Sequence, residues 1–217
     1  MIAGVIYLLL GVLWTWAAGA SPILVVWFVA VAIAGALVPG TANQVTLARA
    51  YLAAPAFVYA LGGQFAALAV TVALAGLTDL VDGTVARRFA QPSNFGGGLD
   101  PVVDGLFAGA LSIGLALGGA IPLWLALVIV ARYLLPALGG GLLILWGRRP
   151  ELRHTLTGQV STVLILVLVG GICLFRGLHQ DSSGLENAAV VVIPVATLAT
   201  FAHLAWASRR VVVAEPG

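Results

Sequence analysis

The sequence contains no lysine and one cysteine, and only 8% of its 217 residues are charged. All ten basic residues are therefore arginine. The single cysteine, Cys173, excludes an internal disulfide and lies in an apolar run, where we expect a small buried or lipid-facing side chain. The pI of about 9.1 reflects the small number of charges, so the chain has no basic surface of the kind that binds nucleic acid.

Hydrophobic side chains, in contrast, make up 61% of the chain, and its mean hydropathy is +1.11. This composition lies far outside that of soluble proteins and predicts an all-α, polytopic membrane protein. About eight apolar runs are long enough to cross a bilayer as helices. They occupy residues 2–19, 22–38, 43–61, 65–86, 96–118, 121–146, 158–176 and 188–207. The first two predict an N-terminal transmembrane hairpin over 1–38, distinct from the remainder at 39–217.

The placement of arginine predicts the orientation in the cell membrane. In this topology only Arg176 falls on one side, and the loop at 177–187 on that side is expected to be a solvated connection. The opposite side carries Arg87, Arg88, Arg148, Arg149, Arg153, Arg209 and Arg210. By the positive-inside rule this second side is cytoplasmic, which also places both termini in the cytoplasm.

Four of the eight acidic residues lie in the single stretch 78–104, between segments that otherwise face lipid. A charged side chain at the centre of a bilayer costs ~3 kcal/mol, so four unpaired carboxylates there would cost roughly 12 kcal/mol. These aspartates must therefore lie near an interface, in a wet cavity or around cations.

The spacing of the stretch predicts two helices with polar faces. If 66–88 is a helix, one of its faces carries Asp79, Asp82, Gly83, Ala86 and Arg87. A second helix that starts near Gly96 carries Gly96, Asp100 and Asp104 on one face. Antiparallel helices would point these carboxylates into a common space, where they repel one another unless cations lie between them.

Carboxylates without nearby cysteine or histidine favour Mg²⁺ or Mn²⁺, and two such ions about 4 Å apart suit phosphoryl chemistry. The residues alone leave another interpretation open. The aspartates could instead compensate the neighbouring arginines, cap helices or line an ion pathway.

The pattern Asp79xxAsp82-Gly83xxAla86-Arg87, followed after eight residues by Gly96xxxAsp100xxxAsp104, resembles the signature of the CDP-alcohol phosphatidyltransferases. All eight fixed positions are present at the family's spacing. The resemblance implies a six-helix catalytic transmembrane domain within 39–217, to which the 1–38 hairpin is added. It also implies an enzyme of phospholipid biosynthesis, active as a homodimer, that transfers the phosphatidyl group of CDP-diacylglycerol to an alcohol and releases CMP.

The resemblance also implies a role for each residue of the signature. Asp79, Asp82 and Asp100 would be metal ligands, and Asp104 would complete the second of two Mg²⁺ or Mn²⁺ sites and act as the base. The CDP group would be bound by Asp82, Gly83, Ala86, Arg87 and Gly96. In that set the small residues would let the nucleotide approach the helices, and the arginine would pair with phosphate.

Upstream, Asn43, Thr46 and Arg49 are spaced by three and could share a helical face. They resemble the opening of the family's first core helix, which implies contacts to the nucleotide or its phosphates. The alternative is a helix cap followed by an arginine that reaches the membrane interface.

Arg132 lies in the middle of an apolar span, where an arginine needs an anion or a polar cavity. Its setting resembles a position in glycerophosphate-using members at which an acid follows the arginine, but here Tyr133 follows. Arg153 and the segment 158–162 resemble a Gly-Lys-x-Lys-Thr element that has lost both lysines. Arg132 and Arg153 are therefore the predicted acceptor-binding residues.

Glycerol 3-phosphate is the leading predicted acceptor. Phosphatidylglycerol, as in cardiolipin synthesis, and inositol phosphate are the alternatives. Two other functions stay open at this point, an ion or proton transporter with an acidic pathway and a non-catalytic membrane scaffold. The carboxylates cluster in the window 79–104, which disfavours a transporter, and the presence of all four aspartates disfavours a scaffold.

Overall fold

The computed structural model describes residues 2–19, 21–38, 40–89, 96–145 and 156–213. Within these ranges the side chains of residues 17–18, 41–42, 79–89, 96–101, 140–145, 156 and 207–213 are not described. The described chain forms eight α-helices and no strand. They are α1 (Ile2–Ala18), α2 (Pro22–Leu37), α3 (Thr41–Leu61), α4 (Phe65–Phe89), α5 (Gly96–Leu117), α6 (Leu123–Leu145), α7 (Leu156–Gly177) and α8 (Ser183–Val213).

The predicted all-α class is confirmed, and each predicted apolar run corresponds to one helix. The prediction of a loop over 177–187 is wrong in its second half, because α8 begins at Ser183. The backbone N–H of Glu186 donates to the Ser182 carbonyl at 3.0 Å, and the Asp181 carboxylate accepts the Ser183 backbone N–H at 3.0 Å. This hydrogen bond lowers the pKa of Asp181. Polar residues thus form the first turn of the helix rather than a solvated loop.

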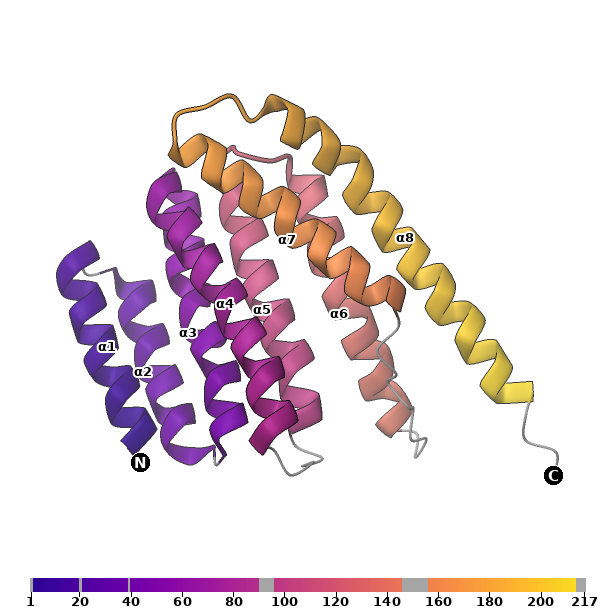
Figure 1. Cartoon of the computed structure of the whole chain (residues 1–217), viewed down its shortest axis with the longest axis horizontal. Coiled ribbons are helices and arrows are strands. Elements are labelled where there is room, and N and C mark those ends of the chain that lie inside the picture. Colours follow the sequence, from indigo (N-terminus) through magenta and orange to yellow (C-terminus); the bar gives the residue numbers. More distant parts are fainter. Residues whose placement is uncertain (1, 20, 39, 90–95, 146–155, 214–217) are drawn as a thin grey trace.

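Figure 1 shows the helices running alternately up and down, with the α1–α2 hairpin at one edge and α8 at the other. The end of α4 and the start of α5 lie at the same end of the molecule as the start of α1. Helices α7 and α8 are inclined to the others; α7 crosses in front of α5 and α6 in this view, and α8 runs along the edge. The aspartate-rich stretch therefore lies at one end of the molecule.

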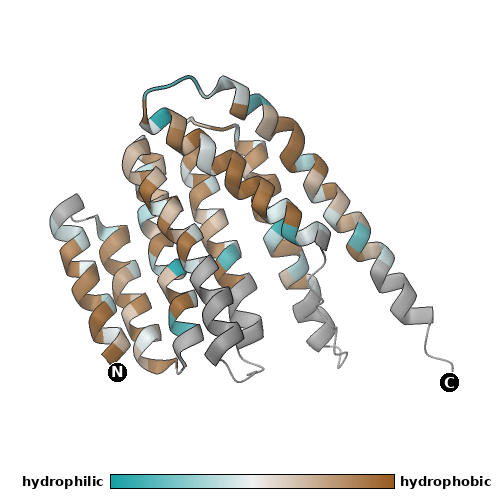
Figure 2. Ribbon diagram, viewed as in Figure 1, coloured by the Kyte–Doolittle hydropathy of each residue, from teal (hydrophilic) through white to brown (hydrophobic). Residues whose placement is uncertain are grey.

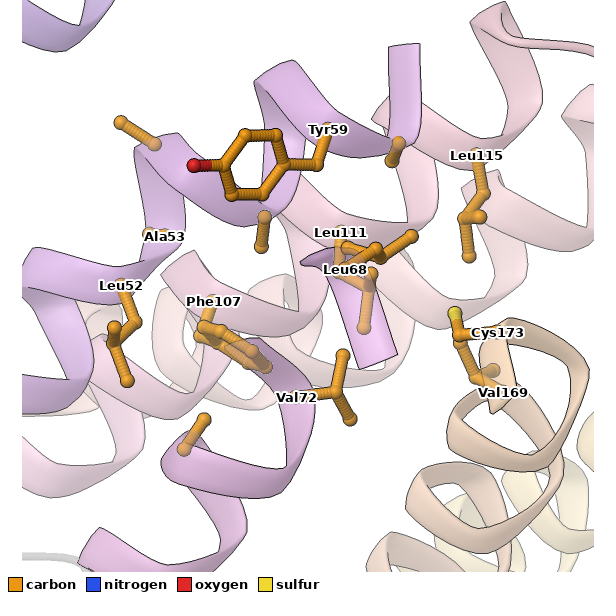
Figure 3. Close-up of a cluster of buried hydrophobic side chains, with 14 of the residues drawn as sticks. Leu52, Ala53, Tyr59, Leu68, Val72, Phe107, Leu111, Leu115, Val169 and Cys173 are labelled. Atoms are coloured by element: carbon orange, nitrogen blue, oxygen red, sulfur yellow. The ribbon is translucent and has the colours of Figure 1, made fainter. Parts of the chain in front are cut away.

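The centre of the bundle is α3, which packs most extensively against α5. Small side chains let the two helices approach each other closely. A Cβ added to Gly114 would lie 2.8 Å from the Phe57 carbonyl oxygen, and one added to Gly118 would lie 2.4 Å from that of Ala60. The surrounding core, drawn in Figure 3, joins α3, α4, α5 and α7. It includes Cys173, which is fully buried. Of the two predicted alternatives for this side chain, buried or lipid-facing, the first is correct.

The outward faces of the helices are apolar, as the hydropathy colouring of Figure 2 shows over α1, α2, α7 and α8. Such broad exposed apolar surface is typical of chains that face lipid. Over the described residues, two helical segments are long and apolar enough to cross a membrane, Thr157–Gly177 and Ser183–Trp206. Five further apolar helical segments are shorter.

A polar cluster closes the end of the bundle opposite the aspartates. Arg176 donates from Nε and Nη2 to Glu186 Oε1 at 3.0 and 2.8 Å, and Nη2 also donates to the Ala120 carbonyl at 3.3 Å. Its guanidinium carbon lies 5.2 Å from the centre of the Phe65 ring. The cluster ties α7 and α8 to the α5–α6 connection and to the start of α4.

Candidate functional site

The eight positions of the acidic signature lie on two consecutive helices. Asp79, Asp82, Gly83, Ala86 and Arg87 belong to the C-terminal half of α4, and Gly96, Asp100 and Asp104 to the first turns of α5. These two halves lie at the same end of the bundle (Figure 1). Asp104 is the one member whose side chain is described, so the predicted convergence of the other carboxylates lies outside the described residues. No group of three or more potential metal ligands occurs among the described side chains.

Asp104 forms an ion pair with Arg49, so the predicted base on α5 and a predicted nucleotide-binding residue on α3 lie side by side. The side chain of Arg49 is 6% exposed and that of Asp104 is 34% exposed. A buried guanidinium needs a counter-ion, and Asp104 supplies one here. The more exposed carboxylate keeps an open side toward the surface at this end of the bundle.

The other two residues predicted on α3 occupy the same half of the helix. Thr46 is buried, and Asn43 is half-buried. Thr46 lies one turn before Arg49 on the same side of α3, and the Arg49 contact shows that this side faces α5. The structure thus brings Arg49 to the helix that carries Asp104.

A cavity of about 80 Å³ lies beside this ion pair, between α4, α5, α6 and α7. Its polar lining consists of Arg49, Asp104, Ser112, Tyr133 and Thr162, and the rest is apolar. Tyr133 lies opposite Gly105, where an added Cβ would be 3.0 Å from the Tyr133 Cβ. The cavity therefore has one charged end, at Asp104, and an apolar body that runs into the bundle.

Arg132 is 7% exposed and joins α6 to α7 and α8. It donates from Nη1 to Thr200 Oγ1 at 3.1 Å, and from Nη2 to the Gly158 carbonyl at 2.8 Å and to Thr162 Oγ1 at 2.9 Å. Ser161 Oγ lies 2.9 Å from Thr200 Oγ1 and extends this polar cluster. Arg132 therefore has polar partners on two other helices inside the bundle, and its predicted role in acceptor binding stays a prediction.

The guanidinium of Arg132 is nevertheless not saturated. These bonds use three of its five N–H donors, and Nε has no hydrogen-bond partner in the described part of the chain. Arg132 is not in the wall of the cavity, but its neighbour Tyr133 and its partner Thr162 are. Arg153, the other predicted acceptor residue, lies outside the described residues.

Sequence reasoning missed the contribution of α8. The partner of Arg132 on that helix, Thr200, is buried and belongs to no motif. A threonine within a long apolar helix was the sole available signal. Such residues usually form hydrogen bonds within their own helix. Thr200 also does so, because its hydroxyl donates to the Ala196 carbonyl at 2.8 Å. Only the packing of α6 against α8 shows the additional contact.

Comparison with known proteins decides the family. A family model described as CDP-alcohol phosphatidyltransferase matches residues 40–207. The chain belongs to this family. The predicted family, enzyme class and role in phospholipid biosynthesis are thereby confirmed. The family uses divalent metal ions, and its members are membrane enzymes.

Relatives with different names match the chain at similar sequence identity. The chain is 34% identical over 177 residues to the "Probable phosphatidylglycerophosphate synthase" of Mycobacterium tuberculosis, a match that covers 77% of this chain and 80% of that protein. It is 32% identical over 145 residues to the "Probable cardiolipin synthase (CMP-forming)" of Drosophila melanogaster, which covers 59% of this chain.

A third relative is the "CDP-diacylglycerol--glycerol-3-phosphate 3-phosphatidyltransferase" of Bacillus subtilis, 32% identical over 106 residues, with 49% of this chain and 54% of that protein covered. The match to the Drosophila protein spans 45% of that protein's length. All three relatives are phospholipid synthases or phosphatidyltransferases by name, but their names imply different acceptors.

Proposed function

We propose that this phosphatidyltransferase uses CDP-diacylglycerol as donor and transfers its phosphatidyl group to the hydroxyl of a polar alcohol. The acceptor oxygen bonds to the phosphatidyl phosphorus, the anhydride P–O bond to CMP breaks, and CMP leaves with the electron pair. The proton of the acceptor hydroxyl passes to Asp104. The observation that carries this assignment is the Arg49–Asp104 pair at the charged end of the cavity, on two helices that the sequence signature links to the same substrate.

Asp104 fits the role of general base by position and exposure. Its carboxylate is one-third exposed at the rim of the cavity, so a hydroxyl can come within hydrogen-bond reach. The Arg49 guanidinium beside it is the counter-ion of this carboxylate. We propose that the same arginine pairs with a phosphate of the donor when the nucleotide binds.

The residues present are suited to Mg²⁺ or Mn²⁺, because the described member of the signature, Asp104, offers hard oxygen and no sulfur or imidazole lies beside it in the cavity wall. We propose Asp79, Asp82, Asp100 and Asp104 as the ligands of two ions. When bound, such ions neutralise the diphosphate oxygens as the bond to CMP breaks. The proposed nucleotide site is completed by small residues and one arginine of the signature and by two residues of α3. These are Gly83, Ala86, Arg87 and Gly96, together with Asn43 and Thr46.

For the acceptor we propose glycerol 3-phosphate, because a buried arginine with an unused Nε lies next to the cavity wall. Arg132 reaches that wall through Thr162, and Arg153 is proposed as a second phosphate contact. The relatives from Mycobacterium tuberculosis and Bacillus subtilis, named for synthesis of phosphatidylglycerophosphate and for glycerol 3-phosphate, favour this acceptor. The Drosophila relative favours the alternative in which phosphatidylglycerol accepts the group and cardiolipin forms.

We further propose a multi-pass protein of the cell membrane with eight spans, both termini in the cytoplasm and the site at the cytoplasmic edge. The alternation of helix direction and the apolar outer faces support this topology. The 1–38 hairpin is proposed as an addition to a catalytic domain over 39–217, consistent with a family match that begins at residue 40. A homodimer is proposed from the family resemblance.

The test is CMP release by purified protein from CDP-diacylglycerol, with Mg²⁺ or Mn²⁺ and a panel of acceptors. Glycerol 3-phosphate, phosphatidylglycerol, inositol phosphate and serine are supplied one at a time. We expect metal-dependent CMP release with glycerol 3-phosphate, and none when a chelator removes the metal. Release with phosphatidylglycerol alone would overturn the acceptor assignment, and no release with any acceptor would overturn the proposed reaction.

A further inference from the structure

The N-terminal hairpin packs on α3, the helix that carries Asn43, Thr46 and Arg49. This hairpin lies outside the stretch that the family model matches, so the family signature assigns it no role. Within the hairpin, α1 and α2 approach each other through glycine: a Cβ on Gly4 would lie 2.6 Å from the Ala32 carbonyl oxygen, and one on Gly11 would lie 2.9 Å from the Phe28 Cβ. The two helices therefore act on α3 as one unit.

Side-chain hydrogen bonds tie α3 to the hairpin along most of its length. The Gln44 side-chain amide donates to the carbonyls of Gly35 and Val38 at 3.1 and 2.7 Å. The Tyr7 hydroxyl donates to the Gln44 backbone carbonyl at 2.5 Å. The Trp27 indole N–H donates to the Ala50 carbonyl at 2.8 Å.

Aromatic stacking continues the same contact. Tyr51 of α3 stacks on Tyr7 and Phe28, with ring centres 5.9 and 4.4 Å apart. Farther along, the Trp14 indole N–H donates to the Tyr59 hydroxyl at 2.6 Å. Offset stacking and hydrogen bonds are directional, so they define one rotation and one depth for α3, which apolar contacts alone do not.

The face of α3 that meets the hairpin is opposite the face that meets Asp104. Gln44, Tyr51 and Tyr59 are seven and eight residues apart, which keeps them on one side of a helix. Arg49 is five residues from Gln44, about 140° away at roughly 100° per residue. A rotation of α3 that broke the Gln44 bonds would therefore carry Arg49 away from Asp104.

We infer that the α1–α2 hairpin positions the nucleotide-binding face of α3, with Gln44 as the main positioning residue and Tyr7 supporting it. This inference rests on the proposed function, because it assumes that Arg49 and its neighbours contact the donor nucleotide. The role inferred for the hairpin is exerted through α3 and needs no contact with the substrate. Its effect is to hold α3 at the rotation in which Arg49 reaches both Asp104 and the donor phosphates.

The experiment compares Gln44→Leu, which keeps the side chain's bulk but removes both amide donors, with Tyr7→Phe, which removes one hydroxyl and keeps the stacked ring. Thr15→Val is the matched control, because the Thr15 hydroxyl bonds within α1, to the Val12 carbonyl at 3.0 Å. For each purified variant we measure kcat, the KM for CDP-diacylglycerol, the KM for the acceptor and the Kd for CDP with Mg²⁺.

Gln44→Leu is expected to raise the donor KM and the CDP Kd about five- to tenfold, the effect of one or two lost hydrogen bonds. Tyr7→Phe should raise both about threefold, and Thr15→Val should raise neither. The acceptor KM stays unchanged in all three. A hairpin that merely stabilised the fold would lower the amount of active protein, and so the apparent kcat, without changing the donor KM or the CDP Kd.

The inference is overturned if Gln44→Leu and Tyr7→Phe lower only the apparent kcat, or if both variants keep the wild-type donor KM and CDP Kd. Neither result affects CMP release by the wild type. If the wild type released no CMP, the proposed function would fall, whereas the CDP affinities of wild type and variants would still test the positioning role. Should Gln44→Leu not accumulate as folded protein, Tyr7→Phe decides the question alone, because it keeps the ring and its packing.

Discussion

The close approach of α5 to α3 predicts that Gly114→Ala will destabilise the protein. The new Cβ would lie 2.8 Å from the Phe57 carbonyl oxygen and 2.9 Å from the Ala60 Cβ, whereas ordinary contacts are 3.4 Å or longer. Because two of its three nearest atoms are backbone, no side-chain rotation can relieve the clash, and the helices must move apart by about 0.6 Å. Overpacking of this kind costs about 1–3 kcal/mol. We therefore expect the melting temperature to fall by about 5 °C.

The assay is thermal unfolding of purified protein in detergent, followed by fluorescence or by aggregation. Gly109→Ala on the same helix is the matched control, because its Cβ would meet only the Val130 Cγ2, at 3.8 Å. The control should melt at the wild-type temperature or above it, since alanine favours helix over glycine by about 1 kcal/mol. Equal melting temperatures for Gly114→Ala and Gly109→Ala would refute the close α3–α5 packing.

Two further substitutions test the Arg132 cluster and the Arg176 cluster separately. Arg132→Met removes three hydrogen bonds between helices. At about 0.6 kcal/mol for each bond, the loss is roughly 2 kcal/mol, so the melting temperature should fall. The acceptor KM should also rise. An unchanged acceptor KM in folded protein would limit Arg132 to a structural role. Arg176→Gln breaks the partly exposed ion pair with Glu186 and should cost about 1 kcal/mol of stability, with both KM values unchanged because the cluster lies at the far end. A changed donor KM in Arg176→Gln would contradict that separation of the two ends.

The sequence was sufficient to predict the helices because each is a long apolar run bounded by glycine, proline or polar residues. The exception, the start of α8, shows the limit of that reasoning. Ser183 and Glu186 are polar and read as loop, yet they form a helical turn because the Ser182 carbonyl accepts the Glu186 backbone N–H. Hydropathy measures affinity for lipid, whereas local hydrogen bonds decide where a helix begins.

The site was predictable only where residue types carry the chemistry. The aspartate spacing predicted α4 and α5 as the helices of the site, and a charged residue in an apolar span marked Arg132 for a polar setting. The pairing of Arg49 with Asp104 could not be predicted, because it depends on the rotation of α3 relative to α5. The same holds for Thr200 and for the contacts of Gln44, since nothing in a single sequence specifies which faces of distant helices meet.

Metal-dependent CMP release by Asp104→Asn is the direct test of the proposed active site. The amide is nearly the same size as the carboxylate but cannot accept the acceptor's proton or bind a cation as well. Asp181→Asn, at an exposed aspartate on the opposite end of the molecule, is the control. We predict that Asp104→Asn folds and releases no CMP above background while Asp181→Asn matches the wild type. Wild-type turnover in Asp104→Asn would contradict the proposed active site.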